Sequence, residues 1–393
     1  MTPRWPDPPH RPTGPLAGVR VLDLTSVVMG PSATLLLAEL GADVVKLEPP
    51  EGDSLRRIGP WRNPGMGPLF LQANAGKRGV VLDLKTAEGR AAALALAGFA
   101  DVFVSNIRPA ALRRLGLDAA TMRAAHPRLI HCLAVGYGSD GPNAGQPVYD
   151  DLMQAASGIA GLFAAVDGAP RYAPVNLCDR VVGLHLAAAI LAALVHRGQG
   201  NDGPGGEGQA IEVPMFETMA GFVLADHLGG AAFAPPLGPM GYPRLLSRAR
   251  GPYPTADGSL AVVVYTDWHW RDFLAAIGRP EMLAEDPRFA SQASRTTHAE
   301  AVGRFLAETL AARPSADWLA LFRRLDIPAC PVNSLETLRA DPHLAAVGFF
   351  GTATHPTEGP LATTRFPVRF SATPVGPPAP APPLGADSGS FLG

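Results

Sequence analysis

The chain has 393 residues, 47% of them hydrophobic, and a formal net charge of −2. Because single hydrophobic cores stop growing at roughly 250–300 residues, this length predicts more than one domain. The small net charge argues against a nucleic-acid-binding protein, which needs a surplus of Lys and Arg to neutralise phosphates.

The first part of the chain alternates short apolar strands with helices. Residues 1–14 are polar and Pro-rich, so we expect a disordered lead without the apolar region of a secretory signal. Strands are predicted at 19–24, 44–47, 80–84, 102–104 and 129–134, with helices at 33–40, 86–97 and 118–125. This order predicts an α/β fold with a parallel sheet, which binds ligands where its strands turn into helices.

Longer helices follow, predicted at 150–163, 179–196 and 214–227, with a polar hairpin at 198–209 and a strand at 210–213. The apolar run Val181–Val195 is interrupted by His185 and is shorter than the ~20 residues of a membrane span, so we expect a buried helix and no membrane contact. The hairpin segment 203–208 reads GPGGEG and matches GxGxxG. It follows a helix and precedes a strand, the reverse of a phosphate cradle, so a solvated turn is favoured.

The composition changes near Leu228. Residues 229–243 are rich in Gly and Pro and indicate a linker or a functional loop. A strand at 260–265 and helices at 268–277, 298–312 and 316–325, with Thr297 and Ser315 as N-caps, predict a smaller α/β domain. We therefore expect a large domain at 15–227, a small domain at 228–334 and a return to the large domain at 335–393.

Cysteines and cations give the first chemical hints. Cys132, Cys178 and Cys330 form no CxxC pair, which indicates neither a disulfide framework nor a zinc site and favours a reducing cytoplasm. Basic clusters precede one strand (Lys77, Arg78) and follow another (Arg108, then 113–114). Each cluster alone is most simply a solvated turn, whereas together they could cradle the phosphates of a nucleotide-like cofactor.

Seven successive segments are informative together: LAGVRVLDLTSVVMGPSATLLLAELGADVVKLEPPEGD, NAGKRGVVLDLK, SNIRPAALRRLGL, YDDLMQAASG, RYAPVNLCD, GEGQAIEVPMFE and IPACPV. In this order they resemble the class III CoA-transferases, the family of formyl-CoA and carnitine CoA-transferases that includes α-methylacyl-CoA racemase. The resemblance covers residues 15 to about 384. It implies a large Rossmann-like domain with a parallel sheet, a smaller α/β domain inserted before the C-terminal return, and an interlocked homodimer.

The resemblance also implies a coenzyme A site without a metal. The residues that align with this pocket are Val27, Val28, Met29, Ala73, Asn74, Ala75, Gly76, Lys77, Arg78, Asn106, Ile107, Arg108, Arg114, Val135, Gly136 and Tyr137. The chain departs from the family at Pro49, where formyl-CoA transferases often carry Arg, so these contacts are expected to shift to Arg56 or Arg57.

Asp179 is the candidate nucleophile. Read locally, an Asp that opens an apolar helix is an N-cap, but the family's catalytic aspartate aligns with this position. We expect the helix dipole to keep the carboxylate ionised and nearby backbone N–H groups to stabilise the oxyanion. Cys178 is a rival nucleophile without an evident His partner, so a small core residue is expected there.

Tyr149 favours transfer over epimerisation. The racemases carry a His base at this position, and a phenol is a poor base at neutral pH. The resemblance thus implies that CoA moves from an acyl-CoA to a carboxylic acid through an aspartyl anhydride and an aspartyl-CoA thioester. A racemase, a CoA hydrolase or lyase, and a non-catalytic acyl-CoA-binding protein remain alternatives.

Overall fold

The computed structural model describes residues 3–9, 13–200 and 206–393. The chain divides into two compact units. Unit 1 comprises Met1–Ser157, Ala173–Gly221 and His343–Gly393, and unit 2 comprises Gly158–Tyr172 and Phe222–Pro342. Each unit is described by itself.

Unit 1 is built on a six-stranded sheet with the order β3-β2-β1-β4-β5-β6, and every neighbouring pair is parallel. The strands are β1 (Arg20–Leu24), β2 (Asp43–Glu48), β3 (Arg78–Val81), β4 (Val102–Ser105), β5 (Ile130–Val135) and β6 (Ala210–Pro214). The predicted parallel sheet is confirmed. The strand order reverses between β1 and β4, and sheets of this type hold ligands outside the carboxyl ends of those two strands.

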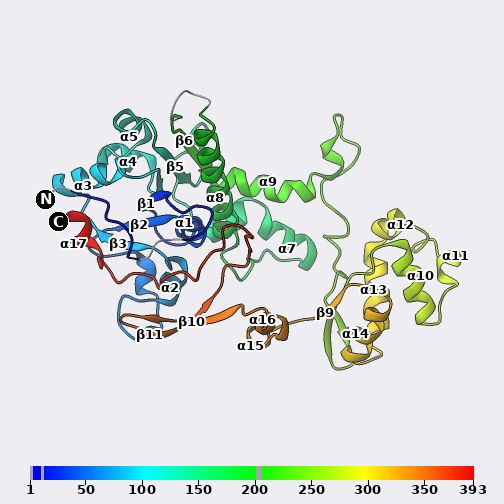
Figure 1. Ribbon diagram of the computed structural model, residues 1–393. Helices are drawn as coiled ribbons and strands as arrows, with labels where there is room; N and C mark the ends of the chain where they lie inside the picture. Colours follow the sequence, from blue (N-terminus) through cyan, green and yellow to red (C-terminus); the bar gives the residue numbers. More distant parts are fainter. Residues whose placement is uncertain (1–2, 10–12, 201–205) are drawn as a thin grey trace. The chain divides into compact units, whose positions relative to one another are not determined.

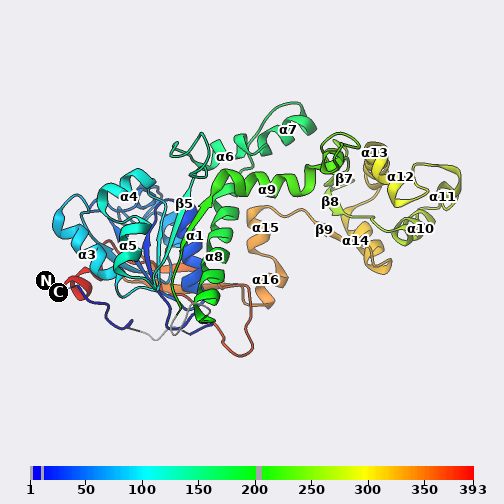
Figure 2. The same cartoon turned by 90° about the horizontal axis from the view of Figure 1, so that it is seen from above.

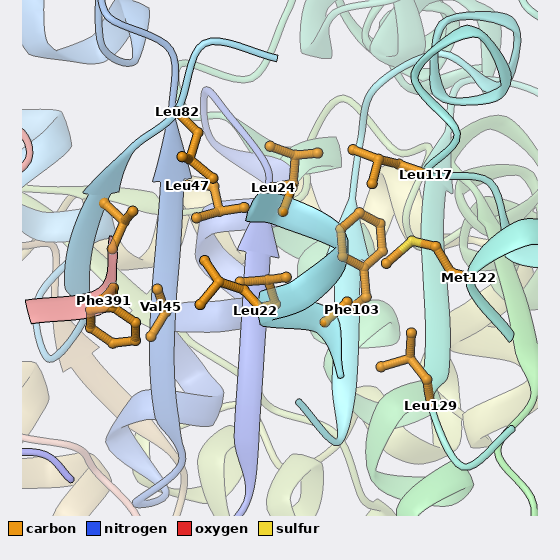
Figure 3. Packing of buried hydrophobic residues seen from close by; sticks show 14 of the residues in the cluster. Leu22, Leu24, Val45, Leu47, Leu82, Phe103, Leu117, Met122, Leu129 and Phe391 are labelled. Atoms are coloured by element: carbon orange, nitrogen blue, oxygen red, sulfur yellow. The ribbon is translucent and has the colours of Figure 1, made fainter. Parts of the chain in front are cut away.

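Helices α3 (Ala87–Ala97), α4 (Pro109–Leu115) and α5 (Ala119–Ala125) cover one face of this sheet (Figures 1 and 2). Leu22, Val45 and Phe103 point from three adjacent strands into the core on this face, where they join Met122 of α5 (Figure 3). The alternate residues of each strand face the other side, as the two-residue repeat of a strand requires.

The opposite face carries α1 (Met29–Glu39) and α8 (Leu177–Gly198), which lie side by side in Figures 1 and 2. Gly183 permits this close approach, because a Cβ there would lie 2.9 Å from the Met29 carbonyl oxygen. Among the described residues, α8 is the one helix that is long and apolar enough to cross a membrane, and 39% of its most apolar stretch is buried. Its buried side includes Val182, Leu186 and Ile190.

The two ends of the chain meet at the β3 edge, where α17 (Ser388–Leu392) packs (Figure 1). Trp5 is only 7% exposed, packs edge-to-face on Phe391 and donates from Nε1 to Asp43 Oδ2 at 2.7 Å. The backbone N–H of Arg4 donates to the Phe391 carbonyl. The expected disorder of residues 1–14 is therefore wrong around Trp5, because a buried aromatic ring anchors this segment.

Several element boundaries differ from the predicted ones. The helix expected at 150–163 is two helices, α6 (Asp150–Ala156) and α7 (Ile159–Asp167), separated at Gly158, whose φ of 95° breaks a helix. The N-caps of α13 and α14 are His298 and Pro314 rather than the predicted Thr297 and Ser315. In the predicted hairpin, residues 201–205 lie outside the described part of the chain.

Unit 1 contains further elements. They are η1 (Ser54–Arg57), α2 (Pro68–Ala73), the start of α9 (Met215–His227), α16 (Pro342–Ala346) and the antiparallel pair β10 (Phe350–His355) and β11 (Gly359–Thr364). Gly76 follows α2 with a φ of 77° and donates its N–H to the Ala379 carbonyl, which ties the C-terminal segment to this unit.

Unit 2 has a three-stranded antiparallel sheet of β7 (Tyr253–Thr255), β8 (Gly258–Val262) and β9 (Ala329–Pro331). Its core packs Trp270 and Phe273 of α10 (Asp267–Ala276) against Trp318 of α14 (Ser315–Arg324) and Leu306 of α13 (Ala299–Leu310). The other elements are α7, the end of α9, η2 (Gly229–Ala232), α11 (Met282–Glu285), α12 (Gln292–Thr297) and α15 (Leu335–Arg339).

Candidate active site

Asp179 lies at the third position of α8, after the N-cap residue Asn176. The carboxylate of Asp150, the first residue of α6, accepts the backbone N–H of Asp179 on Oδ1 at 2.9 Å. Asp150 therefore caps α8 from another helix, and the simple interpretation of Asp179 as an N-cap is wrong. The side chain of Asp179 is left half-buried, with no hydrogen bond to any described residue.

Asp150 is itself fixed by Gln154, one turn further along α6. Gln154 is fully buried and donates from Nε2 to Asp150 Oδ2 at 2.6 Å. Its Oε1 accepts the Ala173 N–H at 2.8 Å, in the segment that leads into α8. This network holds the start of α8 against α6. Sequence reasoning missed Asp150, although it stands in the YDD segment that carried part of the resemblance.

The environment of Asp179 opposes its ionisation. Burial, followed by the negative charge of Asp150, raises the pKa of Asp179 from 3.8 to about 7, and Arg180 opposes the rise only in part. We expected the helix dipole to keep this carboxylate ionised, but a dipole contributes only about 0.3–1 kcal/mol at most sites. Desolvation and the neighbouring carboxylate outweigh it. Asp179 is therefore only partly ionised near neutral pH.

Neighbouring groups limit what else can react here. The backbone N–H groups of Leu177, Asp179 and Arg180 already donate to Val175, Asp150 and Asn176, respectively, so they do not provide the expected oxyanion site. Burial raises the pKa of the Cys178 thiol to about 12, so the thiol stays protonated. Cys178 therefore lacks the thiolate form that a cysteine nucleophile needs.

The start of α8 borders the loop that follows β1, because Arg180 Nη1 donates to Ser32 Oγ of α1 at 2.9 Å. Across the strand reversal, Asn106 exchanges two hydrogen bonds with the backbone of Ser26, at 2.9 and 3.0 Å. The structure thus brings the predicted residues Val27–Met29 and Asn106 to the same edge of the sheet, with α8 alongside. This edge is the position that the strand order favours for a ligand.

Val27 has a φ of 68°, a conformation that costs a β-branched residue on the order of 1–3 kcal/mol. Its N–H points at the carboxylate of Asp53, 3.3 Å away, which also binds the buried Lys46 ammonium at 3.1 Å. Lys46 donates in addition to the Thr25 carbonyl at 2.8 Å. A buried ion pair under the loop therefore holds the strained residue in place.

The predicted residues Val135–Tyr137 end β5 close to the same acids. A Cβ on Gly136 would lie 2.6 Å from the side chain of Val148, which directly precedes Tyr149 and Asp150. Tyr137 packs against Phe216 with 5.2 Å between the ring centroids. Tyr149 is 68% exposed and forms the N-cap of α6. The loop after β5 thus packs against the segment that leads into Asp150, which binds the Asp179 backbone.

The predicted phosphate contacts divide into two groups. Arg108 and Arg114 are exposed at and after the start of α4, and no carboxylate among the described residues pairs with them. Ile107 follows β4 and donates its N–H to Ser105 Oγ at 3.1 Å. These cations therefore remain available to an anionic ligand at the carboxyl end of β4.

Lys77 and Arg78 are not available in this way, which corrects their expected role. The Lys77 ammonium is fully buried and donates to Asp23, Thr34 and Asn74 at 2.8–3.1 Å. Arg78 makes two hydrogen bonds to Asp43 and lies over the Phe391 ring. Both cations are therefore paired with carboxylates inside the fold.

Arg56, another expected phosphate contact, is also paired inside the fold. It forms a two-bond ion pair with Glu48 at 2.6 and 2.8 Å and stacks on Phe70. Arg57 is exposed and donates to the Glu51 carbonyl. Of the remaining predicted residues, Ala73–Gly76 lie at the end of α2, where Asn74 is buried and Ala75 is half-buried. No group of three or more metal-ligating side chains occurs among the described residues.

The chain is similar to known proteins along most of its length. A family model described as CoA-transferase family III matches residues 16–388. A succinate–glutarate CoA-transferase from Agrobacterium fabrum is 32% identical over 98% of this chain and 96% of its own length. A probable fatty acyl-CoA transferase from Mycobacterium tuberculosis is 35% identical over 82% of this chain and 84% of its own.

The chain is similar to solved structures as well. The crystal structure of Rv3272 from M. tuberculosis superposes with a TM-score of 0.83 at 30% identity, covering 97% of this chain and 100% of its own. A CAIB/BAIF family protein from Brucella suis gives a TM-score of 0.79 at 30% identity over 97% of this chain and 99% of its own.

The environment of Asp179 predicts a pH-dependent gain of stability in the variant Asp179→Asn. Folding raises the pKa of this carboxyl group from 3.8 to about 7. The free energy of unfolding therefore falls as the pH rises from 3.8 to about 7, and the full loss of stability is present above that range. Removing the charge should therefore raise the melting temperature more at pH 8 than at pH 5. Thermal unfolding at both pH values measures this difference.

The matched control for this prediction is Asp151→Asn, one residue beyond Asp150 and exposed. It should change the melting temperature equally at both pH values. An Asp179→Asn variant that is no more stable than the native chain at pH 8 would show that the carboxylate is not held in a desolvated pair.

Proposed function

Because the chain belongs to CoA-transferase family III, we propose that it moves CoA from an acyl-CoA to a carboxylic acid, with Asp179 as the nucleophile. One observation carries the assignment of this residue. A half-buried carboxylate without a hydrogen-bond partner among the described residues stands beside the ligand edge of the sheet, and burial, followed by the charge of Asp150, raises its proton affinity. A structural Asp would instead use its oxygens in capping or ion pairing, as Asp150 and Asp23 do.

The reaction consists of four acyl exchanges. The Asp179 carboxylate attacks the thioester carbonyl, and the C–S bond breaks to give a mixed anhydride and CoA thiolate. The thiolate attacks the aspartyl carbonyl, which releases the donor acid and leaves an aspartyl-CoA thioester. The acceptor carboxylate then displaces CoA thiolate to form a second anhydride, and the thiolate attacks the acceptor carbonyl. This last step yields the new acyl-CoA and restores the Asp179 carboxylate.

The raised pKa suits this role. A carboxylate of higher proton affinity is a better nucleophile, and with a pKa of about 7 a substantial fraction is still ionised at neutral pH. Asp150 acts as a positioning residue, because it fixes the backbone of Asp179. Its negative charge also makes the protonated carboxyl group of Asp179 harder to deprotonate. The transfer rate at low substrate concentration should therefore rise with pH through this range and level off above it.

We assign the CoA contacts to the loops that surround this edge. Backbone at Val27–Met29 and Val135–Tyr137 would line the thioester end, with Asn106 and Ile107 between them. Arg108 and Arg114 would bind phosphates, because both cations are exposed and unpaired among the described residues. Succinyl-CoA with glutarate, the pair suggested by the Agrobacterium relative's name, is the first combination to assay.

Two observations bear on the alternatives. Tyr149 is exposed at the position where a racemase carries its His, so no second base faces Asp179 from that position. A CoA-binding protein without catalysis would gain nothing from a destabilised carboxylate, because burial of an unpaired acid costs stability. Transfer therefore remains the function that the site supports best.

We also infer a homodimer in the cytoplasm. The solvent face of α8 exposes Leu184 and Val195, each at 61%, with Ala188 and Ala192 between them on the same helical stripe. An apolar stripe of this kind is suited to a partner surface. The family resemblance implies interlocked chains. Sedimentation at micromolar concentration should give a dimer, and an active native monomer would contradict this assembly.

The transfer assignment predicts that Asp179→Asn abolishes succinyl-CoA-dependent formation of glutaryl-CoA. The amide cannot form an anhydride, so the rate should fall by at least about a thousandfold, as for loss of other covalent nucleophiles. CoA affinity should change by less than about threefold. Mass spectrometry of the CoA thioesters measures the rate, and calorimetry measures CoA binding. Asp151→Asn is the control and should retain native transfer.

The CoA assignment predicts that Arg108→Gln weakens CoA binding about tenfold or more, the cost of one charge-assisted hydrogen bond. The loss should shrink in high salt, where the native contact is screened. Lys85→Gln, which removes an exposed cation elsewhere in unit 1, should leave the affinity unchanged. Equal CoA affinities for the Arg108 variant and the native chain would place the phosphates elsewhere.

A further inference from the structure

Unit 2 contains a cavity of its own, with a volume of about 80 Å³. It is an open pocket lined by the loop 244–250, the end of β8, and helices α12 and α13, and all of its lining residues belong to unit 2. The polar side of the cavity is formed by Arg244, Arg250 and Tyr253. The apolar side includes Val262, Val302 and Leu306.

The loop that carries the arginines is held rigidly against α13. Glu300 accepts from Ser247 Oγ at 2.9 Å and from the Ala249 N–H at 3.1 Å. Gly303 lets the loop approach, because a Cβ there would lie 2.4 Å from the Ala249 carbonyl oxygen. Arg250 therefore projects from a loop that is already ordered, as a preformed binding site requires.

The charges around the cavity leave two guanidinium groups without an anion. Arg295 also lines the cavity, but it is paired with Asp267 and bonded to the Phe289 carbonyl. No carboxylate among the described residues pairs with Arg244 or Arg250, and Arg244 has only a ring contact with Tyr265. Glu300, whose carboxylate reaches this loop, accepts from the Ala249 N–H and from Ser247 Oγ rather than from an arginine.

Arg244, Arg250 and Tyr253 all line this cavity. Burial raises the pKa of Tyr253, and the backbone of Gly251 together with the charges of Arg244 and Arg250 opposes that rise in part. The ring itself packs over Gly251, where a Cβ would lie 2.6 Å from the nearest ring carbon. Two cations and one hydroxyl group thus face the same small space.

We infer that unit 2 binds a small aliphatic carboxylate in this cavity, with the carboxylate between Arg244 and Arg250 and its chain against Val262, Val302 and Leu306. Two guanidinium groups match the two oxygens of a carboxylate. The cavity is smaller than the roughly 150 Å³ cavity that accommodates benzene, so it takes a short chain and excludes a nucleotide. An inorganic phosphate would leave the apolar wall uncovered. Binding here does not require Asp179, which belongs to unit 1.

Trp270 lines the same cavity and provides a local probe of its occupancy. The full-length protein, labelled with 5-fluorotryptophan, is titrated with butyrate while its fluorine spectrum is recorded, and the Trp270 resonance is assigned with Trp270→Phe. This resonance should shift with butyrate and saturate. Butyramide, which lacks the charge, and inorganic phosphate, which lacks the chain, should each bind at least about tenfold more weakly.

Arg244→Gln and Arg250→Gln should each weaken butyrate binding about tenfold or more. Arg248→Gln is the matched control, because Arg248 is exposed on the same loop and does not line the cavity, and it should change the affinity by less than twofold. The inference is overturned if the Trp270 resonance does not respond to butyrate. It is equally overturned if butyramide or phosphate binds as tightly, or if the three arginine variants behave alike. The comparison of the three ligands uses the native chain, so it holds even where a variant does not fold.

Discussion

The hydrogen bond from the Asp179 backbone to the Asp150 carboxylate is the contact on which the proposed chemistry depends. It supplies the cap that α8 would otherwise lack, and it also brings a second negative charge beside the Asp179 side chain. The same interaction therefore stabilises the backbone of Asp179 and disfavours the negative charge on its side chain. Gln154 keeps Asp150 in this position and ties it to the segment before α8.

Buried ion pairs give the ligand edge of the sheet its shape. Lys46 and Asp53 lie beneath the loop after β1 and hold Val27 in a conformation that its side chain disfavours. Lys77 with Asp23 ties β3 to β1 and α1 in the same way. Buried pairs contribute little net stability, but breaking one leaves an uncompensated charge, so they specify a single arrangement of these loops.

The parallel sheet could be predicted because its strands are short apolar runs, and apolar composition by itself predicts that a strand is buried. Whether the cations are exposed or paired could not be predicted, because the sequence around Lys77 and Arg78 does not show whether they face solvent or a carboxylate. Their partners, Asp23 and Asp43, lie 54 and 35 residues away and meet them only through the strand order β3-β2-β1. Asp150 escaped notice for the same reason, because its role depends on a backbone group 29 residues later.

The central claim is that Asp179 carries the acyl group and then CoA, and covalent trapping tests it most directly. Native enzyme is incubated with succinyl-CoA, quenched with hydroxylamine and digested, and the peptide containing residue 179 is analysed by mass spectrometry. We predict a hydroxamate on Asp179, formed because hydroxylamine cleaves the aspartyl thioester or anhydride at the aspartyl carbonyl. An unmodified Asp179 peptide from enzyme that is turning over, or acyl modification at Cys178, would contradict the mechanism.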